Sequence, residues 1–248
     1  GAHLQRLLRE LVSGHAVQEF PQRFSPWRGG SRAIVRPAMT ELIGIAAVAI
    51  VAWFAAGTIW NVRTGRALMR WMQGGLPLIG ERSTVRWLGS TAVEMTIPHG
   101  KAPFTGVTLV IFLEPRDLPW MWAIGRAQRR RDTLIIRGVL RQAPKVEFEA
   151  LDAASWSGRE ALPRVPRDWL VRQGEEPAGA VVHYASVAAL KEADALLQLA
   201  RHEGLMVKRL SVRRSEPHFQ LHVPAPDPRQ PAHDFFKAVQ TLAECGAA

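Results

Sequence analysis

The feature that most constrains this chain is an uncharged, apolar run from Leu42 to Val62. A helix of that length measures about 30 Å at 1.5 Å per residue, which matches the hydrocarbon core of a bilayer. Trp53 and Trp60 lie in its second half and Trp71 follows, as expected where aromatic side chains meet lipid headgroups. We therefore predict a transmembrane helix over residues 41–62.

Two other interpretations of this run fit less well. A helix buried in a globular domain would need about six fully apolar turns enclosed on every side. A cleaved signal peptide normally has an apolar core of about 7–15 residues close to the N-terminus. In this chain 41 residues precede the run, so a membrane span is the interpretation that we carry forward.

The positive charge of the chain is concentrated beside this run. The net charge is +10. Residues 1–40 carry six Arg against two Glu, and residues 63–86 carry five Arg against one Glu. Anionic headgroups attract Arg at such positions by roughly 1 kcal/mol each. The distribution favours a membrane partner over nucleic acid, although nucleic acid is not excluded.

Residues 1–20 have the spacing of an amphipathic helix, and residues 21–40 form a basic linker. Apolar residues recur every third or fourth position, opposite Arg6, Arg9 and Glu10. These apolar residues are Leu4, Leu7, Leu8, Leu11 and Val12. We expect this face to lie on the membrane surface or on another subunit.

Residues 63–82 predict a short interfacial helix and a loop after the span. Arginine side chains can extend from such a helix to the headgroups, while its apolar residues face the bilayer. The arginines are Arg63, Arg66 and Arg70, and the apolar residues are Leu68, Met69 and Trp71.

The rest of the chain predicts an α+β fold of mainly antiparallel sheet backed by helices. A first unit, residues 83–152, has the order ββαββ with a hairpin about Ala143-Pro144. Residues 153–178 predict a linker with one helical turn at Asp168–Arg172. A second unit, residues 179–246, has the order βαββα, with Ser186 as a helix cap. The patterns leave open whether the two units share one sheet.

Residues 117–131 of the first unit predict a helix that could be a functional surface. Asp117 is its expected N-cap, and its apolar residues fall on one face. They are Trp120, Ala123, Ile124 and Ala127, with Trp122 nearby and four arginines toward the C-terminal end: Arg126, Arg129, Arg130 and Arg131. One interpretation is core tryptophans followed by a solvated basic helix end. The other is a docking helix with aromatic anchors and arginines on lipid phosphate.

No motif predicts catalysis, a metal or a cofactor. The glycine spacing of a phosphate loop occurs from Gly75 to Gly80, but Glu81 stands where lysine is required. His218 and His222 lie on a predicted strand, where we expect both to face solvent. Glu147 and Glu149 share the outer face of another strand and are expected to be solvated. We therefore predict a protein that is not an enzyme.

The order of parts resembles the calumin family, which comprises single-pass reticulum membrane proteins of a complex that assists multipass protein insertion. The resemblance is carried by the span, by "GRALMRWMQGGLPLIG" after it, and by "VVHYA" and "HFQLHVPAP", each before a helix. It covers roughly residues 40–245. The chain lacks that family's acidic segment before the span and its lysine-rich coiled-coil tail. The resemblance implies a cytosolic domain and a scaffold role, and it carries over no functional residue.

These patterns lead us to expect a non-catalytic, single-pass accessory or scaffold subunit of a larger membrane complex, bioenergetic or concerned with membrane-protein insertion. Its expected partners are other membrane protein subunits and anionic lipid headgroups. The flanking Arg counts tie at four on each side, so a single cysteine, Cys245, is what favours a cytoplasmic C-terminal domain. The alternatives are a membrane-tethered ribosome or RNA binder and an enzyme with an unrecognised site.

Overall fold

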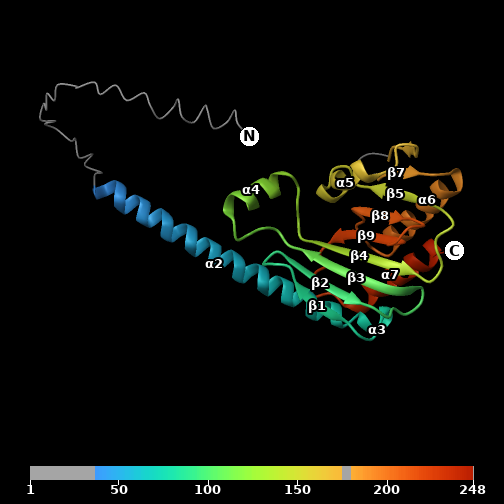
Figure 1. Ribbon diagram of the computed structural model, residues 1–248, viewed down its shortest axis with the longest axis horizontal. Coiled ribbons are helices and arrows are strands. Elements are labelled where there is room, and N and C mark those ends of the chain that lie inside the picture. The colour runs from blue at the N-terminus through green and yellow to red at the C-terminus, as the bar shows by residue number, and fades with distance from the viewer. Residues whose placement is uncertain (1–36, 175–179, 248) are drawn as a thin grey trace, which may run out of the picture. The chain divides into compact units, whose positions relative to one another are not determined.

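The computed structural model describes residues 37–174 and 180–247. These residues form an α+β structure with one antiparallel sheet of nine strands and one long apolar helix (Figure 1). The predicted α+β class with an antiparallel sheet is therefore confirmed. The predicted amphipathic helix over residues 1–20 and most of the basic linker lie outside the described residues.

The described chain contains six α-helices, one 3-10 turn and nine strands. In chain order they are α2 (Pro37–Gln73), α3 (Leu76–Ile79), β1 (Thr84–Trp87), β2 (Ala92–Ile97), β3 (Phe104–Phe112), α4 (Pro119–Ala127), β4 (Thr133–Leu140), β5 (Phe148–Leu151), α5 (Trp156–Ala161), a 3-10 turn (Leu162–Arg164), β6 (Leu170–Arg172), β7 (Val181–Tyr184), α6 (Val187–His202), β8 (Arg209–Val212), β9 (Phe219–Pro224) and α7 (Ala232–Ala247).

Strands from both predicted units lie in the same sheet, which answers the question that the sequence left open. The strand order is β1-β2-β3-β4-β9-β8-β5-β7-β6. Strand β4 pairs with β9, for example Ile136 with Leu221. The hairpin expected about Ala143-Pro144 is wrong, because β5 pairs with β7 and β8 rather than with β4. Strands β9 and β8, which come later in the chain, lie between β4 and β5 in the sheet.

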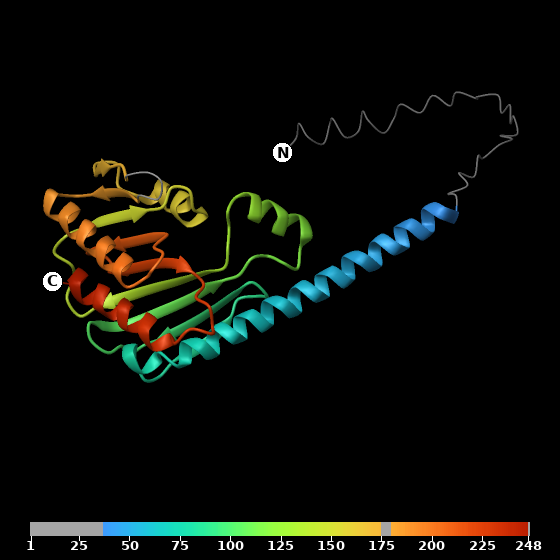
Figure 2. The ribbon, with the colours of Figure 1, turned by 180° about the vertical axis from the view of Figure 1, so that it is seen from behind.

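One face of the sheet packs against helices α6 and α7, the C-terminal part of α2, and α3 (Figure 2). Alternate strand residues point into this core, for example Phe219 and Leu221 on β9. Ser186 caps α6 by accepting a hydrogen bond from the Ala189 amide at 3.2 Å, as predicted. Helices α6 and α7 each bury one apolar face, which includes Ala193 on α6 and Phe236 on α7.

The C-terminal part of α2 belongs to this core and not to a membrane surface. Trp71 is buried, its ring lies 5.7 Å from that of Phe236, and its indole N–H donates to the Gln230 carbonyl oxygen at 2.7 Å. Leu68 is also buried, and Met69 is half-buried. The expectation that these residues face the bilayer is wrong, because α2 continues unbroken to Gln73 and this turn meets α7.

The predicted linker over residues 153–178 contains regular structure. Helix α5 begins after Ser155, whose hydroxyl oxygen accepts from the Gly158 amide at 2.9 Å. The helical turn expected at Asp168–Arg172 is wrong, because Leu170–Arg172 form the edge strand β6 paired with β7. This segment forms backbone hydrogen bonds with β7. Its local composition, rich in Pro, Gly and charge, does not indicate that pairing.

Candidate membrane interface

Helix α2 has two halves with different surroundings. Every residue from Met39 to Ala56 is exposed. One helix of the described chain, Met39–Gln73, is long and apolar enough to cross a membrane, and only 6% of its most apolar window is buried. From Gly57 onward, residues three or four apart are buried against the domain, namely Gly57, Asn61, Gly65, Leu68 and Met72. The packed face therefore starts inside the predicted span, about one and a half turns before its end.

Two glycines allow α2 to approach the domain closely. A Cβ atom at Gly57 would clash with the backbone carbonyl group of Arg116. A Cβ atom at Gly65 would lie 2.8 Å from the Trp87 ring. Real Cβ contacts of this kind do not occur, so a side chain at Gly57 would push the helix away from the Arg116 backbone, whereas one at Gly65 would displace the Trp87 ring.

A polar cluster lies where α2 meets the loop before α4. The Arg116 guanidinium donates to Asn61 Oδ1 at 3.1 Å and to Asp132 Oδ2 at 2.7 Å. Asp132 Oδ1 accepts from the Glu114 amide at 2.7 Å. Asn61, the chain's one asparagine, is fully buried. The cluster therefore joins the packed half of α2 to the loop before α4 through partly buried polar contacts.

Helix α4 is attached to the domain by polar contacts and exposes its apolar face. The buried carboxylate of Glu114 accepts from the Trp122 indole at 2.8 Å and lies 3.5 Å from the Arg126 guanidinium. Trp120 and Ile124 are 54% and 56% exposed, and Ala123 and Ala127 are exposed as well. The predicted apolar stripe therefore exists but faces outward, and core packing is the wrong interpretation for Trp120.

The expected N-cap of α4 is also wrong. Leu118 occupies the cap position without a side-chain hydrogen bond. Asp117 instead accepts a hydrogen bond from the Ser90 hydroxyl at 2.7 Å. The carboxylate thus holds the α4 loop to the turn between β1 and β2.

Aromatic residues from α2 and α4 gather beside this junction. The Trp53 indole donates to the Arg116 carbonyl oxygen at 2.9 Å, and its ring centre lies 6.2 Å from that of Trp122. The Arg116 guanidinium lies 6.0 Å from the centre of the Trp60 ring. Trp53, Trp60 and Trp122, which the sequence suggested as partner or lipid contacts, therefore lie around the loop before α4.

The predicted arginines have unequal surroundings. Arg126 lies over the Trp122 ring, and Arg130 lies 4.8 Å from the centre of the Trp156 ring. Arg131 donates to the carbonyl oxygen of Arg130 at 2.7 Å. The three arginines of α2 lie on the half of the helix that packs on the domain, but their own side chains are exposed. They are Arg63, Arg66 and Arg70.

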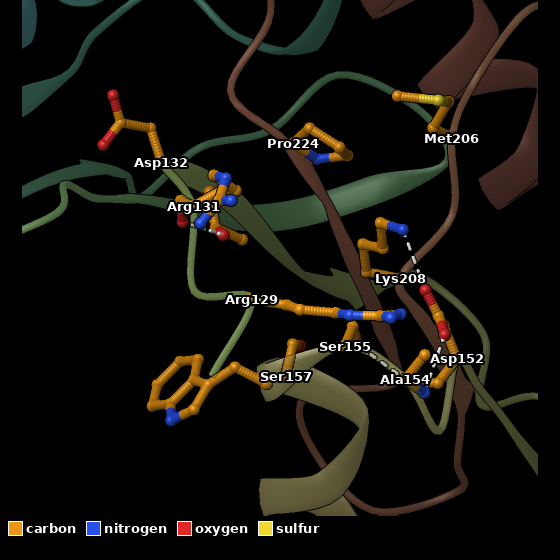
Figure 3. A pocket seen from close by; sticks show the side chains of 12 residues that line it. Arg129, Arg131, Asp132, Asp152, Ala154, Ser155, Ser157, Met206, Lys208 and Pro224 are labelled. Atoms are coloured by element: carbon orange, nitrogen blue, oxygen red, sulfur yellow. Dashed lines mark hydrogen bonds and ion pairs between the residues drawn. The ribbon is translucent and has the colours of Figure 1, made fainter. Parts of the chain in front are cut away.

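A groove of about 470 Å³ begins at the C-terminal end of α4 (Figure 3). Its wall includes Arg129 and Arg131 after α4, Ser155 and Ser157 around the start of α5, and Lys208 before β8. Lys208 pairs with Asp152 at 2.8 Å. In Figure 3 the Arg129 side chain extends across the groove between Ser157 and Lys208.

The sheet face opposite the core carries buried polar residues that alternation predicted to lie in solvent. Glu149 is fully buried and accepts from Arg209, from Ser211 at 3.1 Å and from Arg213 at 2.7 Å. His218 is buried and its Nδ1 accepts from the Leu140 amide at 3.0 Å. The expectation that Glu149 and these histidines are solvated is wrong, because α5 and neighbouring arginines cover a face that alternation alone predicts to be outward.

His222 and Ser157 are hydrogen-bonded to each other, which raises the question of a catalytic pair. The Gln220 amide nitrogen, a donor only, lies 2.6 Å from His222 Nε2, so Nδ1 carries the hydrogen that faces Ser157. Burial, with Arg209 and Arg137 nearby, lowers the pKa of His222 to about 3. A base must accept the serine proton, and this imidazole donates to the serine instead.

Within the described ranges, no group of three or more His, Cys, Asp and Glu side chains could hold a metal ion. The sequence patterns indicated neither the Asn61–Arg116–Asp132 cluster nor the groove. A lone asparagine on the buried side of an apolar helix was the signal that could have indicated the first.

Neither a scan against models of protein families nor a search of curated proteins finds a match for this chain.

Proposed function

We propose that this chain is a single-pass, non-catalytic accessory subunit of a larger membrane complex, with α2 crossing the bilayer and the sheet domain resting on its cytoplasmic surface. The observation that carries the proposal is the exposed half of α2, which leaves the domain beside the outward-facing apolar stripe of α4. The order of parts resembling the calumin family agrees with a scaffold role.

The tertiary contacts support a span that lies nearer the N-terminus than residues 41–62. Residues 37–56 precede the packed face and measure about 30 Å as a helix, enough to cross the hydrocarbon core. The bilayer surface then lies at the level of Trp53, Trp120 and Trp122. Arg63 is about 9 Å further along α2 than Gly57, and Arg70 about 20 Å, so Arg63 reaches the headgroups whereas Arg70 does not.

Helix α4 is the interfacial helix in this proposal. Its Trp120, Met121 and Ile124 are exposed, and its arginines follow at the C-terminal end. Apolar side chains beside a span and arginines just above it are typical of a helix in the headgroup layer.

A spin label tests this placement. We expect a label on an Ile124→Cys variant, made in a Cys245→Ser background and reconstituted in lipid nanodiscs, to be shielded from a water-soluble relaxation agent and accessible to oxygen. The matched control is Val187→Cys on α6, which is 65% exposed and should be accessible to the water-soluble agent. Equal accessibility of the two labels to that agent would contradict an interfacial α4.

A partner subunit is supported by the edge strand β1. All four of its residues are exposed, and Trp87 lies against Gly65 of α2. An exposed edge offers unpaired backbone groups to a strand of another chain. A partner spanning the same membrane could pair with β1 while it contacts α2.

Purification in mild detergent followed by mass spectrometry tests the subunit proposal. We expect a stoichiometric membrane protein partner, and we expect Val85→Lys on β1 to reduce its recovery. The control, Val171→Lys, places the same charge on the opposite edge strand β6, where Val171 is exposed. A monomer without a stoichiometric partner would refute the proposal.

A further inference from the structure

The groove at the end of α4 contains positive charge that the rest of the described protein does not neutralise. Four arginines lie on it or beside it: Arg129, Arg130, Arg131 and Arg159. None of them forms an ion pair with a carboxylate of the described residues. Arg159 donates only to the carbonyl oxygens of Ala154 and Gln128, each at 2.7 Å.

The two carboxylates of the groove are already occupied. Asp152 accepts from the Ala154 amide at 2.9 Å and from Lys208 at 2.8 Å. Asp132 is turned toward the α2 junction, where the Glu114 amide and Arg116 use both of its oxygens. The electrostatic balance of the groove is therefore positive, and its free donors come from guanidinium groups.

Arg129 occupies a backbone position that favours glycine. Its φ is 58°, in the left-handed region. The amide of Arg129 donates to the Arg126 carbonyl at 3.0 Å, and the amide of Arg130 donates to the Gly125 carbonyl at 2.8 Å. This is the Schellman ending of a helix, in which the left-handed residue is usually Gly or Asn. An arginine there is less stable than glycine, and such strain is often retained where the side chain has a function.

We propose that this groove binds a phosphate group, held by Arg129 and Arg131. Arginine presents paired N–H donors that match phosphate oxygens, and the hydrogen bonds are charge-assisted. The phosphate belongs either to an anionic lipid headgroup or to a small soluble phosphate. The lipid source rests on the membrane position proposed above, whereas phosphate binding in itself does not.

Calorimetry on the full chain in a neutral detergent measures the site without a bilayer. Inorganic phosphate and glycerol phosphate are the probes. We expect Arg129→Gln to weaken their binding about tenfold, as for the loss of one charge-assisted contact. Arg201→Gln, which removes the same charge from an exposed position on α6, should leave binding unchanged.

Arg129→Gly separates a ligand-binding role from a structural one. Glycine relieves the left-handed backbone, so we expect the melting temperature to rise by about 2–4 °C while phosphate binding weakens about tenfold. A variant that gains stability and loses the ligand cannot owe the loss to misfolding. Unchanged phosphate binding in both Arg129 variants would overturn the proposal.

Vesicles distinguish the sources of the phosphate. The chain is reconstituted into phosphatidylcholine vesicles with or without phosphatidic acid, and protection of the groove is followed by hydrogen exchange at Ala154 and Trp156. Protection that requires phosphatidic acid and is lost in Arg129→Gln supports a lipid headgroup. Protection by soluble phosphate alone supports the soluble source.

Two results would contradict different claims, one the membrane position of α4 and the other phosphate binding by the groove. If α4 proves to be water-exposed but phosphate still binds in detergent, the membrane position fails and the groove stands. If single-stranded RNA binds in an Arg129-dependent way while phosphate and phosphatidic acid do not, the phosphate-ligand proposal is overturned in favour of a nucleic-acid surface.

Discussion

The indole N–H of Trp53 donates a hydrogen bond to the backbone carbonyl oxygen of Arg116, 2.9 Å away. These residues are 63 positions apart in the chain. The contact joins the last exposed turns of α2 to the loop that leads into α4. Together with Gly57 and Asn61 it sets where the helix leaves the domain.

Gly57→Ala should loosen this junction. The new methyl group would clash with the Arg116 backbone, which cannot rotate away as a side chain could, so we expect a loss of about 1–3 kcal/mol. Gly44→Ala is the control on the same helix, because nothing lies within 4 Å of a Cβ atom there. Alanine at that position should be neutral or stabilising. Thermal unfolding of both variants in detergent makes the comparison, and equal melting temperatures would contradict a close approach at Gly57.

Asp132→Asn should destabilise the domain more than the same change in a surface pair. Asp132 and Arg116 have side chains only 20% and 18% exposed, so the variant leaves a guanidinium short of its anion at a cost of about 2 kcal/mol. The comparison is Asp194→Asn, because Asp194 and its partner Arg172 have more exposed side chains, at 43% and 36%. Exposed pairs contribute about 0–1 kcal/mol. Chemical denaturation monitored by circular dichroism measures the free energy of unfolding of both variants. A larger loss of stability in Asp194→Asn than in Asp132→Asn would contradict the prediction.

His222 should make the domain sensitive to acid. Burial, reinforced by Arg209 and Arg137, lowers the pKa of His222 from 6.5 to about 3. Between these values the unfolded chain binds a proton that the folded chain does not, so the free energy of unfolding falls as the pH falls, by up to about 1.4 kcal/mol per pH unit. Above about pH 6.5 the imidazole is neutral in both states and this dependence ends.

His222→Asn should therefore lose less stability than the parent protein between about pH 6.5 and about pH 5. Part of the acid sensitivity remains, because burial also lowers the pKa of His183, against the opposing effect of Glu149. His233→Asn, at an exposed position on α7, should retain the full slope of the parent. Denaturant unfolding at several pH values gives the slopes, and identical slopes in the parent and His222→Asn would contradict the prediction.

Cys245 is a native labelling site that can report on which side of the membrane the domain lies. It is the chain's one cysteine and its residue is exposed near the end of α7. With a cytoplasmic domain, a membrane-impermeant maleimide should label inverted vesicles and leave right-side-out vesicles unlabelled until they are permeabilised. Cys245→Ser provides the blank. Labelling of intact right-side-out vesicles would place the domain on the other side.

The sequence alone determined the elements that depend on local patterns. The uncharged run predicts a long apolar helix because backbone hydrogen bonding and burial in lipid both require one. Ser186 and the alternation of Phe219, Leu221 and Val223 likewise predict a cap and a strand that the structure confirms. Such signals are local, since they reflect helix and strand periodicity and capping geometry.

Only the tertiary structure decided what covers each apolar or polar face. Periodicity predicts that Trp71 and Trp120 each lie on an apolar face, yet α7 buries the first and nothing in the described chain buries the second. The pairing of β4 with β9 buries His222 and brings Arg137 near it, and residues about 85 positions apart leave no mark on each other's local pattern. Contacts of this range depend on how the whole chain packs, which is why the junction at Asn61 and the arginine groove appear only once the strands and helices are assembled.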